Sequence, residues 1–282
     1  MKSQAKRVEQ VITPEPVVEG AGVRLKRSIG TKRLNYLDPF LLFDDFSSPD
    51  PRDFEAGFPL HPHRGIETVT YLLKGEVRHK DTLGNAGNIG AGDLQWMTAG
   101  RGIMHEEMPQ AKPGGIAGFQ LWVNLPARLK MAPPRYQDVR AAQIRETPME
   151  GGAVVRVIAG KAGGVTGPVT GIAADPTYLD VSISAGASFT LPAEPGHSSF
   201  VYLFEGEAEF PGGAKVAAPR LAVLGEGGQV QAAAGRAGAR FLLVCGKPLG
   251  EPIARYGPFV MNTREEIEQT LKEIREGTFV TA

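Results

Sequence analysis

The chain has 282 residues, enough for one large domain or two of medium size with a well-buried core. Its 31 Lys and Arg residues are balanced by 31 Asp and Glu residues, which argues against a nucleic-acid or membrane surface held by bulk charge. The single cysteine, Cys245, cannot form a disulfide within the chain, and its apolar run FLLVCG predicts that it is buried.

The N-terminal segment carries no targeting signal that we recognise. MKSQAKRVEQVITPEP lacks an apolar core of signal-peptide length, and no stretch approaches ~20 consecutive apolar residues. We therefore expect a cytoplasmic protein with no membrane partner. The densest basic run, KRSIGTKR from Lys26 to Arg33, is predicted to be a solvated turn.

Short apolar runs alternate with turns along most of the chain. The 36 glycines and 22 prolines separate runs such as FLLFDDF, ETVTYLL, AGFQLWVNL and FVYLFEGEAEF. Many short strands between such turns are typical of an all-β sandwich or barrel. Trp96, Met97 and Phe119 lie in these runs, and we expect them to pack in the core of a barrel rather than to hold a substrate.

Only the end of the chain has the period of a helix. In TREEIEQTLKEIREG, which starts at Thr263, three apolar residues recur at helical spacing on one face: Ile267, Leu271 and Ile274. Thr263 is a suitable N-cap, and Gly277 can end the helix. We expect this helix to cover a sheet.

The two halves of the chain look like degenerate repeats. YLLKGEV, from Tyr71 to Val77, matches YLFEGEA, from Tyr202 to Ala208. Each reads as a strand, a turn glycine and a second strand. The composition around residues 133–152 is rich in Pro and Gly, which favours a domain boundary there. We therefore predict an N-terminal barrel over residues 1–133 and a C-terminal barrel, with the final helix, over residues 134–282.

Two segments combine residue types that bind metals. His61 and His63 are two positions apart at the start of a strand-like run, so their imidazoles can share one face while Pro62 points away. His105 and Glu107 repeat the same spacing. Two such pairs on neighbouring antiparallel strands would place three imidazoles and a carboxylate around one centre, a metal site with open coordination positions.

The spacing leaves the carboxylate ligand open. Glu67 has the strand parity of His61 and His63, so either Glu67 or Glu107 can complete the site. Glu106 has the opposite parity and should point outward. A single H-x-H pair also occurs as ordinary polar residues at a strand end. By parity His79 could face either side of its strand, and we favour a polar surface histidine. The second half repeats no metal pattern, because Pro192 and Glu194 hold the places of His61 and His63.

Several motifs resemble those of the pirin family of bicupins: HPHRGIETVTYLLKGEVRHKD, GDLQWMTAGRGIMHEEMP, FQLWVNLP and GPFVMNTREEI. The resemblance runs from about Asp38 to the C-terminal helix. It implies two tandem cupin β-barrels of the jelly-roll type, with one metal in the N-terminal barrel. The implied ligands are His61, His63, His105 and Glu107, which favours Glu107 over Glu67 as the carboxylate. The implied metal is Fe(II) first, with Mn, Ni, Co, Cu or Zn as alternatives.

Two functions follow from this resemblance. Some pirin-like proteins resemble flavonol dioxygenases, which cleave quercetin at its 2,3 bond with O₂ and release carbon monoxide. In that reading the substrate enolate binds the metal, Glu107 accepts the hydroxyl proton, and Arg64 serves the rim or a salt bridge. The alternative is a redox-sensing metal protein that regulates transcription or metabolism through protein contacts. The neutral charge argues against direct DNA binding in either case.

Overall fold

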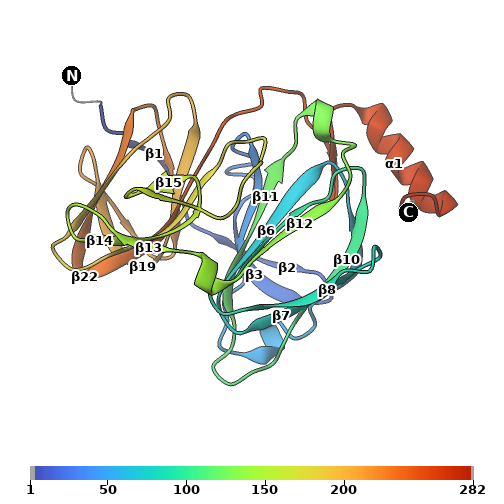
Figure 1. Cartoon of the computed structure of the whole chain (residues 1–282), viewed down its shortest axis with the longest axis horizontal. Helices are drawn as coiled ribbons and strands as arrows, with labels where there is room; N and C mark the ends of the chain where they lie inside the picture. The colour runs from blue at the N-terminus through green and yellow to red at the C-terminus, as the bar shows by residue number, and fades with distance from the viewer. Residues whose placement is uncertain (1–3, 281–282) are drawn as a thin grey trace. The chain divides into compact units, whose positions relative to one another are not determined.

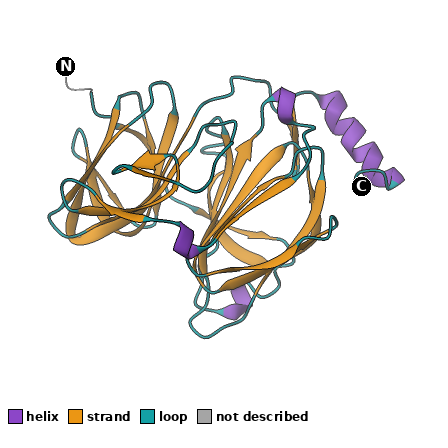
Figure 2. Cartoon of the chain, in the orientation of Figure 1, coloured by secondary structure: helices purple, strands orange, loops and turns teal. Residues whose placement is uncertain are grey.

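The structure is a computed structural model that describes residues 4–280, and strands dominate it (Figure 2). The chain forms two compact units (Figure 1). Of the described residues, 15–30, 40–141 and 249–280 form one unit, called here the N-terminal barrel. Residues 4–14, 31–39 and 142–248 form the other, the C-terminal barrel. These units differ from two consecutive halves, since each takes in a segment from the far part of the chain.

Two antiparallel sheets build the N-terminal barrel. Their strands are β2 (Glu15–Glu19), β3 (Val23–Ile29), β4 (Phe40–Asp45), β5 (Phe58–His63), β6 (Ile66–Lys74), β7 (Glu76–Asp81), β8 (Ala86–Gly90), β9 (Leu94–Thr98), β10 (Ile103–Pro109), β11 (Ala117–Asn124) and β12 (Arg135–Val139). The larger sheet has the order β12-β9-β6-β11-β4-β3-β2, and the smaller has the order β5-β10-β7-β8. Strand β5 is therefore an edge strand.

The C-terminal barrel repeats this topology. Its main strands are β1 (Val8–Ile12), β13 (Glu146–Pro148), β14 (Ala153–Ala159), β17 (Thr177–Ile183), β18 (Ser188–Pro192), β19 (Ser198–Phe210), β20 (Ala214–Ala217), β21 (Arg220–Leu224) and β22 (Gln229–Gly246). They follow the order β1-β21-β19-β22-β17-β14-β13, with β18 on β22 and β20 on β19. The short pair β15 (Lys161–Ala162) and β16 (Val165–Thr166) lies apart from this sheet. Because β1 pairs with β21, the N-terminal segment belongs to this barrel.

The predicted repeat is visible in the register. Tyr71 on β6 lies between β9 and β11, and Tyr202 on β19 lies between β21 and β22. Both tyrosines are buried. The two-barrel fold predicted from the sequence is confirmed, and the buried positions of Trp96, Met97 and Phe119 confirm that they are core residues.

The interior differs between the barrels. In the C-terminal barrel, β18 pairs with the first part of β22, as β5 pairs with β10 in the N-terminal barrel. Phe189, Leu191 and Val230 fill the C-terminal interior from these strands as part of one apolar cluster. Large apolar side chains therefore occupy the region where the N-terminal barrel carries histidines. Cys245 belongs to the same cluster, and burial raises the pKa of its thiol to about 11.

Helix α1 (Arg264–Glu276) begins and ends as predicted. Thr263 and Glu266 form a capping box, and Gly277 ends the helix with a left-handed backbone, φ +70°. The predicted apolar face is only partly correct, because Ile267 is buried but Ile274 is 39% exposed. The helix packs on β23 (Ala254–Tyr256) and β24 (Phe259–Met261) through its N-terminal part. No helix within residues 4–280 is long and apolar enough to span a membrane.

Arg64 holds this helix to the N-terminal barrel. Its guanidinium is buried, lies 2.6 Å from the carboxylate of Glu273 and donates to Oγ1 of Thr270 at 3.0 Å. The guanidinium also stacks over the Phe279 ring, 4.6 Å from its centroid. The expected salt bridge of Arg64 is therefore confirmed. Arg64 and Thr270 are 206 positions apart in the chain. Their contact explains why α1 belongs to the same unit as the N-terminal barrel.

Candidate metal centre

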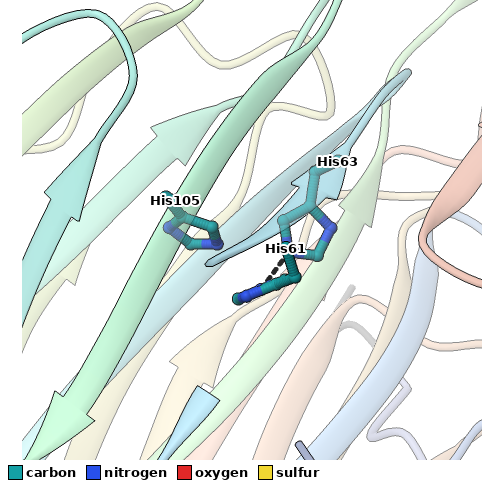
Figure 3. A group of neighbouring side chains, drawn as sticks. All are labelled: His61, His63 and His105. Carbon is teal, nitrogen blue, oxygen red and sulfur yellow. Dashed lines mark hydrogen bonds between the residues drawn. The ribbon is translucent and has the colours of Figure 1, made fainter. Parts of the chain in front are cut away.

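Three histidines meet inside the N-terminal barrel. His61 and His63 extend from edge strand β5, and His105 extends from β10, directly opposite His61 in the antiparallel register. Figure 3 shows the three rings facing one another, with a dashed line between His61 and His63. Pro62 is tolerated between the two histidines because an edge strand leaves backbone donors unpaired anyway.

The geometry of the three rings fits a metal ion. Nε2 of His61 and Nε2 of His63 are 3.0 Å apart, and one ligand nitrogen from each of the three rings lies within 4.8 Å of the others. Two nitrogens bound at 2.0–2.1 Å and at right angles to each other are about 3.0 Å apart. Among the described residues, neither ring nitrogen of buried His105 has a hydrogen-bond partner. Buried orphan nitrogens are costly, and coordination would satisfy one of them.

The protonation of the rings also suits a metal. Burial, followed by the neighbouring histidines, holds the pKa of His63 and of His105 well below the usual range. Both imidazoles are therefore neutral at pH 7 and offer a lone pair without first losing a proton. A set of neutral imidazoles without a cysteine suits Fe(II), Mn(II), Ni(II) or Co(II) better than structural zinc.

Glu107 lies beside this centre but outside the three-histidine cluster. It is buried on β10, lines the same cavity as His61 and His63, and accepts a hydrogen bond from Thr70 at 3.0 Å. Burial raises the pKa of its carboxyl, and the nearby His61 partly opposes that rise. Glu106, the neighbour with opposite parity, is only half-buried and does not line the cavity.

Glu67 is not part of the three-histidine cluster. Its carboxylate accepts from Thr98 on β9 at 2.7 Å, and it lines no part of the cavity. Arg64 and Gly65 separate β5 from β6, and Gly65 adopts φ +76°, a left-handed turn that only glycine takes readily. Parity counted from His63 therefore does not continue into β6. The sequence could not decide whether Glu67 is the carboxylate ligand, because residue spacing alone does not reveal the turn at Gly65.

The prediction for His79 is wrong. His79 is 6% exposed on β7, opposite Glu107 in the β7–β10 register, with its ring 5.8 Å from that of Tyr136. Residues opposite each other on neighbouring antiparallel strands share a face, so His79 points to the same inner face as Glu107, which lines the cavity. The sequence of this short strand does not show which of its two faces is buried, so the orientation of His79 could not be predicted from it.

A cavity of about 500 Å³ opens beside the histidines. Its walls mix apolar and polar side chains, as small-molecule sites usually do. The aromatic part of the lining consists of Phe46, Phe54, Phe58 and Trp122, and the polar part includes Thr70, Gln120, Arg27, Asp44 and Arg255.

The basic run that we predicted to be a solvated turn is partly a wall of this cavity. Lys26 and Arg27 lie on β3, and the turn begins only at Gly30. Arg27 binds both carboxylate oxygens of Asp44, each at 2.8 Å, and Glu19 at 2.8 Å. Strand alternation gives Lys26 and Arg27 opposite faces, so the solvated-turn prediction is wrong for Arg27.

Sequence reasoning missed Thr70, Gln120, Trp122 and Arg255. Thr70 and Gln120 are polar residues inside apolar strands, which is a usable signal for a polar interior. Oγ1 of Thr70 lies 2.7 Å from Oε1 of Gln120. A hydroxyl has one hydrogen, so Thr70 can donate to Oε1 of Gln120 or to Oε1 of Glu107, one at a time. For Arg255, no local pattern reveals its place in the cavity.

Comparison with known families agrees with this structure. The Pirin family model matches residues 22–123, and the Pirin C-terminal cupin domain model matches residues 178–280. The first match contains all three histidines of the cluster and Glu107. The second match lies in the half that has no metal pattern.

Three similar proteins cover nearly the whole chain. A protein of Pseudomonas aeruginosa named "Putative quercetin 2,3-dioxygenase" is 46% identical, with 96% of each chain covered. Human pirin is 44% identical over 96% of this chain and 93% of its own. The crystal structure of quercetin 2,3-dioxygenase from Acinetobacter baumannii has a TM-score of 0.88 at 35% identity, with 99% of each chain covered.

Proposed function

This chain belongs to the pirin family, and from that premise we propose that it is a metal-dependent dioxygenase that cleaves a flavonol such as quercetin at the 2,3 bond with O₂. One observation carries the proposal furthest. Two histidines of the three-histidine cluster, His61 and His63, and the buried carboxylate of Glu107 line one cavity, which is of a size that takes a small aromatic molecule. The two similar proteins named for quercetin 2,3-dioxygenase support the same reaction class.

We assign His61, His63 and His105 as metal ligands, with Glu107 as the fourth ligand and as the base, and Fe(II) as the metal. When bound, a redox metal with open positions supplies activation of O₂ and of an enolate oxygen. The chain's own part is proton transfer and orientation. Glu107 takes the 3-hydroxyl proton of the flavonol, and its raised pKa suits a base that must later return that proton.

The cavity lining orients the ring system. Trp122 presents its ring edge-on to His63, with centroids 5.1 Å apart and an interplanar angle of 86°. Phe46, Phe54 and Phe58 supply apolar walls that keep water from the reacting carbons. The reaction balances without another reactant, since both oxygen atoms of O₂ enter the ester product and C3 leaves as CO with its own oxygen.

The experiment follows O₂ uptake and CO release from quercetin by the metal-loaded protein. We expect Glu107→Gln to lower the turnover about 100-fold or more, because general base catalysis contributes this much. Glu106→Gln is the matched control, since it removes the neighbouring carboxylate from the same strand but not from the cavity. Glu67→Gln tests the other carboxylate and should also keep its activity.

Each outcome separates the candidate functions. Loss in Glu107→Gln with both controls active supports the dioxygenase and the assignment of Glu107. Loss of turnover in Glu67→Gln alone would show that Glu67, and not Glu107, is the general base. A wild-type protein that holds one equivalent of metal and releases no CO from quercetin would sink the proposal and favour the redox-sensing regulator.

A further inference from the structure

Arg255 is a cation of the cavity that forms no ion pair with any carboxylate among residues 4–280. It lies on β23, directly after Ala254, and its side chain lines the cavity. The residue is exposed to solvent. Its guanidinium stacks over Trp122, 5.2 Å from the ring centroid. The ring centroids of Trp122 and His63 are 5.1 Å apart. The Trp122 side chain therefore lies between the Arg255 guanidinium and the histidine cluster and contacts both.

The charged residues around Arg255 in the cavity wall are already paired with one another. Arg27 binds Asp44 through two hydrogen bonds and also binds Glu19. Asp44 and Glu19 attract Arg255 electrostatically, and Arg27 repels it, but no carboxylate of the described residues forms an ion pair with Arg255. Glu19 and Asp44 are thus taken up by Arg27, and Arg255 is left without an ion pair although it lines the same wall.

The hydrogen bonds of Arg255 leave one edge of its guanidinium open. Nε donates to the carbonyl of Gly257 at 3.4 Å, and Nη1 donates to the carbonyl of Leu41 at 3.2 Å. Nη2 donates to no described residue, and Nη1 has a second hydrogen. Two parallel N–H groups at the end of a guanidinium match the two oxygens of a carboxylate.

We propose that Arg255 is the receptor for a carboxylate of the ligand, at the end remote from the metal centre, so that the cavity selects metal-binding aromatic molecules that carry an acid group. This inference rests on the proposed function, because a flavonol-like head anchored at the histidines aims the rest of the molecule along Trp122. The substrate class is then an aromatic carboxylate with a metal-binding hydroxyl–carbonyl pair.

The test compares two ligands of one shape that differ in charge. The probes are 3-hydroxyflavone-4′-carboxylate and its 4′-carboxamide, titrated under argon against the Fe(II)-loaded protein so that no turnover occurs. Quenching of the fluorescence of the two tryptophans, of which Trp122 lines the cavity, reports binding. We expect the wild type to bind the carboxylate about tenfold more tightly at low salt, with the preference falling as ionic strength rises.

Three variants locate that preference. Arg255→Gln should remove it while leaving the affinity for the carboxamide unchanged. Arg255→Lys should keep part of it, because lysine retains the charge but not the paired donors. Arg52→Gln is the control: Arg52 is 85% exposed in its side chain, binds Asp50 and lies outside the cavity. It should bind both probes as the wild type does.

Equal affinities in the wild type, a preference that survives in Arg255→Gln, or no binding of either probe would each overturn the inference. Its failure is separable from failure of the proposed function. A protein that releases CO from quercetin but binds both probes equally contradicts only the role of Arg255. A protein that prefers the carboxylate but releases no CO in air contradicts only the dioxygenase.

Discussion

Oγ1 of Thr70 on β6 lies 3.0 Å from Oε1 of Glu107 on β10, although the two residues are 37 positions apart and belong to different sheets. Both side chains are buried. The hydroxyl can therefore hold the Glu107 carboxylate at the cavity, with Oε1 of Gln120 on β11 as its other acceptor.

Replacing Thr70 with Val should lower flavonol turnover about 10- to 100-fold, because a hydrogen bond to a charged group contributes about 1.5–3 kcal/mol. The metal content should stay at the wild-type level, since the three histidines are untouched. Thr68→Val is the matched control, a buried threonine on the same strand that does not line the cavity. Initial rates and metal analysis on both variants decide the matter; equal losses would contradict a special role for Thr70.

Replacing His105 with Ala should release the metal and leave the all-β circular dichroism spectrum intact. Added metal stabilises a protein that binds it only when folded, so the wild-type melting temperature should rise with metal and that of His105→Ala should not. His79→Gln is the control, because His79 is buried nearby but lies outside the three-histidine cluster. Loss of the folded spectrum in His105→Ala would instead show that the metal is structural.

Gly65 ends the turn between β5 and β6 in a place that has no room for a side chain. A Cβ there would lie 2.0 Å from the carbonyl oxygen of Val260, and the backbone has φ +76°. Gly65→Ala should lower the free energy of unfolding by about 3 kcal/mol or more. Gly84→Ala separates clash from strain, since Gly84 has φ +91° but nothing within 4 Å, and should cost about 1 kcal/mol. Equal losses in chemical denaturation would contradict the clash.

Lys130 supplies a pH dependence that is independent of the metal. The residue is 1% exposed, its ammonium donates to Gly65, Asn124 and Val260, and burial lowers its pKa to about 8. Between that value and the unfolded pKa of 10.5, the unfolded chain binds more protons than the folded one. The free energy of unfolding should therefore rise with pH from about 8 to about 10.5, by at most about 1.4 kcal/mol per unit.

The control for this slope is Lys130→Met, which has a similar volume and no charge. The variant should be less stable at pH 7, because three carbonyl-type oxygens lose their donor. The difference in unfolding free energy between wild type and variant, measured by denaturation from pH 7 to pH 10.5, should change across the stated window. A difference that stays constant would show that the pKa of Lys130 is not lowered.

Local sequence patterns correctly predicted the features that depend only on neighbouring residues within one strand or helix. The pairs His61–His63 and His105–Glu107 were readable because alternation in a strand places i and i+2 on one face. The ends of α1 were readable because Thr263, Glu266 and Gly277 act within one or two turns of the chain. The apolar runs predicted the strands for the same reason.

Local sequence patterns gave wrong or incomplete predictions where a turn or a distant segment determines which face of an element is buried. The turn at Gly65 breaks the alternation between His63 and Glu67, and the pairing of β7 with β10 places His79 on the buried face of Glu107. Ile274 keeps its helical spacing but remains exposed, because β23 and β24 contact only the first part of α1. In each case the residue's period is correct and its environment is set by another segment.

The sequence by itself determined the strand-rich fold, the repeat and the histidines of the metal centre, because each is written in spacings of a few residues. Only the tertiary structure decided the walls of the cavity. Arg27 from β3 and Arg255 from the far end of the chain line one cavity with Trp122, and Thr70 reaches Glu107 from another sheet. Strand pairing brings such residues together, and the choice of pairing partner depends on how whole sheets bury their apolar faces rather than on any single stretch.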